Sequence, residues 1–166
     1  MAAVDGLIRD ENGKWIHGLM VNIRITMSAL AELWGIWQGM ILAKTLGARN
    51  LIIEADAKWV IDALKKEESE DIQHETIFKD CEEMKKEGWV TDIKHNWGEW
   101  KHCAERLANL TLERDEGTQW LEKAPEELSH LLLADINGVE LLRWCTTKRC
   151  GFFPLVQNKK LYKLKS

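Results

Sequence analysis

Three acidic residues and one histidine stand at positions where their side chains could share a chemical task. Asp56 directly follows an apolar, strand-like run, and open α/β sheets place their sites just past the carboxyl ends of strands. Glu32 and Glu105 each lie in a predicted helix beside small or apolar residues, and His95 ends a second predicted strand. Carboxylates held together repel one another, so such a cluster would need a divalent cation.

Mg²⁺ is the cation that suits these residues best, because it prefers carboxylate and water oxygens. Two such ions about 3.5–4 Å apart can bind the attacking water and the leaving oxygen of a phosphodiester during in-line displacement. His95 would then assist proton transfer or product release. Each residue also has an ordinary interpretation: Asp56 as a helix N-cap, Glu32 and Glu105 as helix-surface acids, and His95 as a polar strand end.

The elements around these residues predict a mixed α/β fold, in which paired strands precede alternating helices and strands. A hairpin is expected over 7–25, with Asn12-Gly13 as a type I′ turn and with Trp15, Leu19 and Val21 on one face. Two further strands are predicted over 50–54 and 88–95. Helices are predicted over 28–46, 74–86 and 99–113, and two more begin at 56 and at 125.

The predicted helix over 28–46 carries an apolar stripe at helical spacing, formed by Leu30, Leu33, Trp34, Trp37 and Ile41. We therefore expect Trp34 and Trp37 in the core. Gly47 would end this helix in the left-handed conformation.

Five segments resemble, in order and with similar spacing, the reverse-transcriptase-associated ribonuclease H-like domain of plant retroelements. They are Gly6–Trp15, Ala31–Gly35, Ile53–Asp56, His95–Leu110 and Trp120–Val139. The resemblance covers residues 6–139 and implies a ribonuclease H-like fold, a mixed five-stranded α/β sheet with helices on its faces.

The resemblance also implies an activity: Mg²⁺-dependent endonucleolytic hydrolysis of the RNA strand of RNA/DNA hybrids. On that basis Glu32, Asp56 and Glu105 would be catalytic carboxylates that bind Mg²⁺ or Mn²⁺, and His95 would be an auxiliary catalytic histidine. The expected partner is nucleic acid, above all an RNA/DNA hybrid, and no membrane.

Three features depart from the family's pattern. The family begins with a strand whose Asp-Gly-Ser motif binds both metals. We expect this strand to be missing, as in an N-terminally truncated domain. Asp5 directly precedes the hairpin strand and is not expected to replace the aspartate of that motif. Glu105 stands where aspartate is usual, and Gly98-Glu99-Trp100-Lys101 stands where Arg-Glu-Ala-Asn is usual. The alternative function is therefore an inactive retroelement-derived domain that binds nucleic acid or serves as a structural or interaction module.

The missing strand would lie between the hairpin and the strand that ends before Asp56. Buried backbone amides without partners are costly, so another segment should take that place. Gly151–Val156 is one candidate, although Pro154 argues against a central strand. The other possibility is exposed strand edges, which invite association.

We expect three regions: a ribonuclease H-like domain lacking its first strand over 1–115, a trailing helical segment over 116–140, and a flexible basic tail over 141–166. The net charge is −4, yet the tail holds seven basic and no acidic residues. Such a tail either attracts phosphates or is simply solvated. The four cysteines fit no zinc spacing, which favours a reduced intracellular protein of the nucleus or cytoplasm.

Overall fold

The computed structural model describes residues 2–23, 28–55, 57–66, 75–95, 106–107, 109–111, 117–136 and 155–158. The elements up to β4 follow the predicted order: β1 Ala2–Arg9, β2 Trp15–Ile23, α1 Ser28–Thr45, β3 Leu51–Ala55, α2 Lys58–Lys66, α3 Glu75–Lys86 and β4 Val90–His95. Helical residues follow at 106–107 and 109–111. The last elements are β5 Gly117–Leu121, the 3₁₀ turn Glu126–Leu128, α5 Ser129–Ile136 and β6 Leu155–Asn158.

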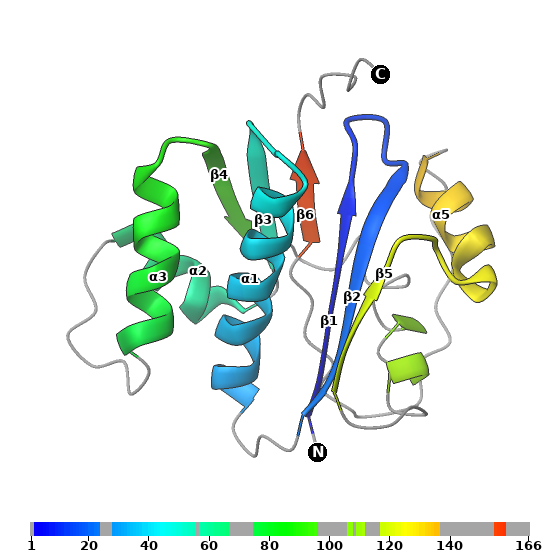
Figure 1. Ribbon diagram of the computed structural model, residues 1–166, viewed down its shortest axis with the longest axis horizontal. Coiled ribbons are helices and arrows are strands. Elements are labelled where there is room, and N and C mark those ends of the chain that lie inside the picture. The colour runs from blue at the N-terminus through cyan, green and yellow to red at the C-terminus, as the bar shows by residue number, and fades with distance from the viewer. Residues whose placement is uncertain are drawn as a thin grey trace.

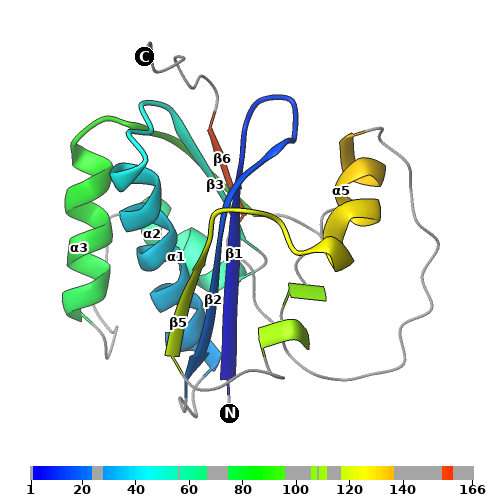
Figure 2. The same ribbon diagram turned by 45° about the vertical axis from the view of Figure 1, so that its right-hand side comes forward.

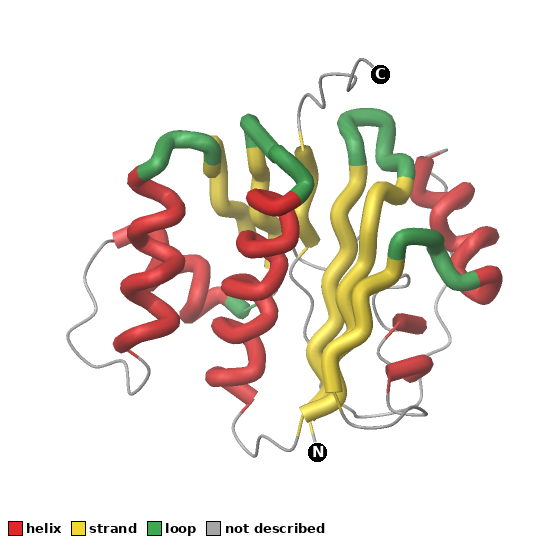
Figure 3. Tube along the Cα trace, in the orientation of Figure 1, coloured by secondary structure: helices red, strands yellow, loops and turns green. Residues whose placement is uncertain are grey.

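The strands form one mixed six-stranded sheet with the order β4-β3-β6-β1-β2-β5. β1 and β2 pair antiparallel, whereas β3 and β4 pair parallel, so the sheet has an antiparallel half and a parallel half (Figures 1 and 3). This arrangement confirms the predicted mixed α/β fold and is consistent with a ribonuclease H-like sheet.

β6 joins the two halves of the sheet. It pairs parallel with β1, where Val156 lies opposite Ile8, and antiparallel with β3, where Val156 lies opposite Ile53. A segment from near the C-terminus therefore fills the central position of the sheet. Residues 151–156 were one of the two possibilities predicted for this position. Leu155 and Val156 belong to the candidate segment, and Pro154 precedes the strand, so the missing proline N–H lies outside this ladder.

The hairpin between β1 and β2 differs from the predicted type I′ turn. The loop has three residues and is closed by a hydrogen bond from the Asp10 amide to the Lys14 carbonyl. Within the loop, the Gly13 amide donates to the Asp10 carbonyl, and Gly13 has φ 76°. The Asp10 carboxylate accepts hydrogen bonds from the amides of Asn12 and Lys14, both at 2.9 Å. These two bonds stabilise the longer loop in preference to the two-residue turn.

The prediction that Trp15 shares a face with Leu19 and Val21 is also wrong. The register shifts between Ile8 and Arg9, so that Ile8 lies opposite His17 but Arg9 lies opposite Trp15. This bulge reverses the alternation of side chains at the start of β2. Trp15 consequently packs near Leu7 and Met20, on the face opposite Leu19 and Val21.

Helices cover both faces of the sheet (Figure 2). On one face, α1, α2 and α3 pack over Ile8 and β3; this core includes Leu33, Ile36, Met40, Ile53, Val60, Ile61, Leu64 and Phe78. On the other face, the helical residues 106–111 and α5 pack over Leu7 and Met20 with Leu107, Leu110, Leu128, Leu131 and Leu132. Because neighbouring residues of a strand point to opposite faces, β1 contributes Leu7 to one core and Ile8 to the other.

The buried stripe of α1 is Leu33, Ile36, Met40 and Ala43, all 0% exposed. Trp34 and Trp37 are half-buried and pack against the outside of two core clusters, so the prediction that both lie in the core holds only in part. Their rings contact each other at the helix flank, with centroids 6.1 Å apart. Smaller residues occupy the closest helix–sheet contact, because two indoles there would hold the helix away from the sheet.

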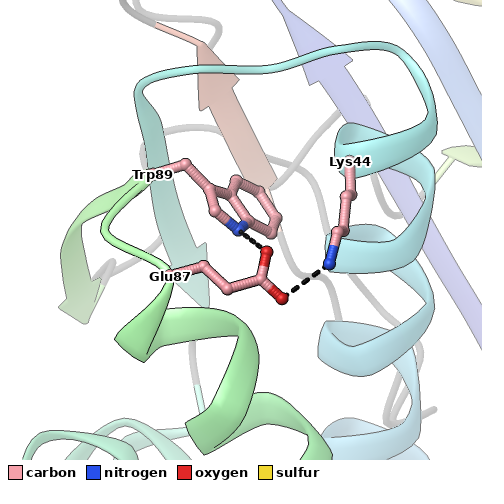
Figure 4. A network of polar contacts seen from close by, with 3 residues as sticks. All are labelled: Lys44, Glu87 and Trp89. Atoms are coloured by element: carbon pink, nitrogen blue, oxygen red, sulfur yellow. Dashed lines mark hydrogen bonds and ion pairs between the residues drawn. The ribbon is translucent and has the colours of Figure 1, made fainter.

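The C-terminal end of α1 is held by two sets of hydrogen bonds. Gly47, with φ 74°, donates to Lys44 O and Ala48 donates to Ala43 O, which confirms the predicted glycine C-cap. Glu87 then links α1 to the turn before β4, because its carboxylate accepts from Lys44 at 2.6 Å and from the Trp89 indole at 3.2 Å (Figure 4). The hydrogen bond from the Lys44 ammonium lowers the pKa of Glu87.

The central position of β6 yields the first prediction. We expect Val156→Pro to lower the urea midpoint of unfolding, because a proline lacks the N–H that a central strand uses and leaves one carbonyl unpaired, at a cost of about 1–3 kcal/mol. Val156→Thr keeps the N–H and the branched side chain and serves as the matched control. Equal midpoints for the two variants would show that 155–158 does not pair in the sheet.

Candidate active site

The carboxyl ends of β3 and β4 lie side by side. The two strands are parallel, and Ala55 at the end of β3 is paired with His95 at the end of β4. Asp56, which lies outside the described residues, directly follows Ala55 in the sequence. His95 is half-buried. One predicted site residue, His95, therefore lies at a strand end beside Ala55, the residue that precedes Asp56 in the sequence.

Glu32 lies at the same edge of the sheet. Its Oε2 accepts a hydrogen bond of 2.8 Å from the Nε1–H of Trp59. Trp59 is in the first turn of α2, three residues beyond Asp56. Glu32 is half-buried, and its neighbours Ala31 and Leu33 are buried. The structure thus brings Glu32 to the chain segment that contains Asp56, as a shared site requires.

Glu105 lies outside the described residues, so its predicted place in the site stays a prediction. Arg106, which follows it, is exposed, and Leu107 is fully buried against the core that contains Leu7. Within the described ranges, no group of three or more histidine, cysteine, aspartate or glutamate side chains is close enough to hold a metal ion. The Mg²⁺ site formed by Glu32, Asp56 and Glu105 remains a prediction for the same reason.

Asp5 is a buried acid whose burial was not predicted from the sequence. It lies in the middle of β1, is 0% exposed, and accepts a hydrogen bond from the Thr111 hydroxyl. Burial raises the pKa of Asp5 from 3.8 to about 7, and the Thr111 bond opposes that rise. An acid between the apolar residues Val4 and Leu7 was the signal that could have revealed it.

The surroundings of Asp5 favour its protonated form. The Thr111 hydroxyl has one proton, and it lies within hydrogen-bonding distance of both the Asp5 carboxyl and the Leu107 carbonyl, the latter at 2.9 Å. Because this single proton is divided between two acceptors, the Thr111 bond offsets only part of the cost of a charged Asp5. Asp5 Oδ2 is buried with no hydrogen-bond partner among the described residues, which adds to the cost of the charged form.

Asp5 and Glu32 come from opposite sides of the sheet. Asp5 shares a strand face with Leu7, which packs against residues 106–111 and α5, whereas α1 packs over the face of Ile8. The expectation that Asp5 does not replace the family's first aspartate is consistent with this geometry.

The comparison with protein families agrees with the fold. The family model described as reverse transcriptase-like matches residues 1–111. The chain belongs to the reverse transcriptase-like family. The match covers β1 to β4 and the helical residues up to Thr111, which include all four predicted site residues, and it confirms the ribonuclease H-like resemblance.

One relative of the chain is a protein of Arabidopsis thaliana that is provisionally named a ribonuclease H protein. It is 27% identical to the chain over 138 residues, which are 83% of this chain and 22% of the Arabidopsis protein. The chain therefore spans less than a quarter of that relative's length.

The buried Asp5 yields a prediction about pH. Because the folded state holds the Asp5 proton up to about pH 7 and the unfolded state loses it near 3.8, the folded state binds more protons between these values. The free energy of unfolding should therefore fall as pH rises through this window, at up to about 1.4 kcal/mol per pH unit, and level off above it.

Asp5→Asn should remove most of this dependence and be more stable than the wild type at pH 8, as measured by urea unfolding across the window. Asp80→Asn, which changes a half-buried acid on α3, is the matched control and should keep the wild-type slope. A wild-type stability that is flat or rises over the window would contradict the assignment.

Proposed function

We propose that this chain is a ribonuclease H-type domain that binds RNA/DNA hybrids and hydrolyses their RNA strand with the help of Mg²⁺. The observation that carries the proposal is the hydrogen bond that joins Glu32 to the first turn of α2, just beyond the carboxyl end of β3, which is paired with the end of β4. Sites of open α/β sheets lie at such ends, and this edge carries Asp56 and His95 in the sequence.

Glu32, Asp56 and Glu105 would hold the cation, either Mg²⁺ or Mn²⁺. Carboxylates are the ligands that these hard ions prefer, and the described member of the set fits this role: Glu32 is half-buried and accepts a hydrogen bond from the uncharged Trp59 indole. The bound cation would supply charge stabilisation at the phosphodiester that is hydrolysed. His95, at the adjacent strand end, would move the proton of the water or of the leaving oxygen.

The basic residues of 141–166 would add attraction to the phosphate backbone. The rest of the chain carries a net charge of −11, from 16 basic and 27 acidic residues, so it repels nucleic acid at long range. Seven basic residues without an acid offset this repulsion. The proposed setting is intracellular, where RNA/DNA hybrids form.

A second candidate is a domain that binds the hybrid without cutting it. The buried position of Asp5 favours this candidate, because the one described acid of β1 faces away from the side of α1 and Glu32. Loss of one bridging carboxylate weakens a two-metal site more than it weakens contacts to the phosphate backbone.

Cleavage of a labelled RNA/DNA hybrid in Mg²⁺ or Mn²⁺ decides between the two candidates. We expect the wild type to cut the RNA strand, and Asp56→Asn and Glu32→Gln to reduce the rate at least about 100-fold, because both remove a ligand charge. Asp62→Asn, an exposed acid of α2 paired with Lys58, should cut like the wild type. A folded wild type that binds but does not cut would leave the second candidate.

Hybrid binding should depend on salt through the basic tail. Neutralising Lys159 and Lys160 to glutamine should lower the slope of log affinity against log salt by roughly 0.7–0.9 for each phosphate that the variant no longer binds. The control is the same change at Lys79 and Lys86 of α3, and fluorescence anisotropy at several salt concentrations gives the slopes. Equal slopes for both double variants would rule out the tail as a phosphate-binding segment.

A further inference from the structure

Trp59 connects the start of α2 with the first half of α1. Its Nε1–H donates to Glu32 Oε2 at 2.8 Å, across 27 positions of sequence. The indole is 40% exposed, and this hydrogen bond is the directional contact of its polar N–H. Glu32 is half-buried beside it. The hydrogen bond to Glu32 is thus the specific interaction that orients this side chain.

Both partners of this contact are held by buried neighbours. Val60 and Ile61 follow Trp59 and are at most 1% exposed, which fixes the first turn of α2 against the core. Leu33 follows Glu32 and is 0% exposed, which fixes that part of α1. The Trp59–Glu32 bond therefore fixes the Glu32 carboxylate relative to the first turn of α2.

The chemistry of the donor matters as much as its position. A lysine or arginine at the position of Trp59 would form an ion pair with Glu32 and compete with a cation for its charge. An indole is a donor only and carries no charge, so it orients the carboxylate without neutralising it. Hydrogen-bonded neighbours of metal-binding side chains commonly have this orienting role.

We propose that Trp59 is a positioning residue that holds Glu32 in place as a ligand of a divalent cation. The inference rests on the proposed assignment of Glu32 to the cation site and adds to it the residue that supports the ligand. Removing such a supporting hydrogen bond typically weakens metal affinity by about 10–100-fold.

The contact itself can be tested by nuclear magnetic resonance of the indole N–H groups in the full chain. Trp59→Phe identifies the Trp59 signal by its loss. Glu32→Gln should shift this signal and leave that of Trp120, an exposed indole on β5, unchanged. Addition of Mg²⁺ to the wild type should shift the Trp59 signal as well. A Trp59 signal that responds to neither change would overturn the inference.

The supporting role is tested by Mg²⁺ affinity, measured from the shifts of the Ala55 and His95 amides. Trp59→Phe keeps an aromatic ring and removes the N–H donor, so we expect the Mg²⁺ affinity of this variant to fall about 10–100-fold. Trp120→Phe makes the same change in side-chain size at a distant site and should bind Mg²⁺ like the wild type. Wild-type affinity in Trp59→Phe would refute the role of Trp59.

The outcomes also separate this inference from the proposed function. Mg²⁺ binding that depends on Trp59, without cleavage of the hybrid, would refute the proposed hydrolysis and support the role of Trp59. Cleavage and Mg²⁺ binding that are both unchanged in Trp59→Phe would refute the role of Trp59 alone. Absence of any Mg²⁺-dependent shift in the wild type would refute both.

Discussion

Backbone hydrogen bonding at the middle of the sheet is the constraint that holds the two halves of the molecule together. β1 and β3 each have one neighbour from their own half, β2 and β4, and each buries apolar residues on its faces. An inner strand needs partners on both sides, since a buried amide without one costs free energy. β6 supplies these partners to both strands and so makes one sheet from two halves. β3 therefore lies one strand away from the hairpin, with β6 between them.

The two faces of the sheet present two kinds of carboxyl environment. Glu32 lies at the edge where β3 and β4 end, is half-buried, and accepts a hydrogen bond from an uncharged indole. Asp5 lies inside the molecule under Thr111, where burial raises its pKa to about 7. The first environment suits a cation ligand, and the second suits a neutral, structural acid. A carboxylate on an inner strand does not by itself form a cation site. The face of the sheet on which it lies and its exposure to water decide its role.

Local periodicity was sufficient to predict the elements from α1 to β4, because each carries a clear pattern of apolar residues and a recognisable end such as Gly47. β5 was not predicted as a strand and β6 was only one of two possibilities, since each is short and acquires its partner from far along the chain. The face of Trp15 was predicted wrongly because a bulge interrupts the alternation. The resemblance implied that Glu32 and Asp56 share a site. Trp59 as the hydrogen-bond donor to Glu32 depends instead on how two helices pack, and no spacing in the sequence encodes that.

The proposed function depends above all on a divalent cation binding at the carboxyl ends of β3 and β4, beside Glu32. A Mn²⁺ titration followed by paramagnetic broadening of backbone amide signals locates the ion, because broadening falls off steeply with distance from it. We expect the amides of Glu32, Ala55 and His95 to broaden first and Glu32→Gln to weaken the effect. Broadening that begins instead at the acidic surface of α3, around Asp80 and Glu83, would contradict this binding site, as would broadening around Asp5.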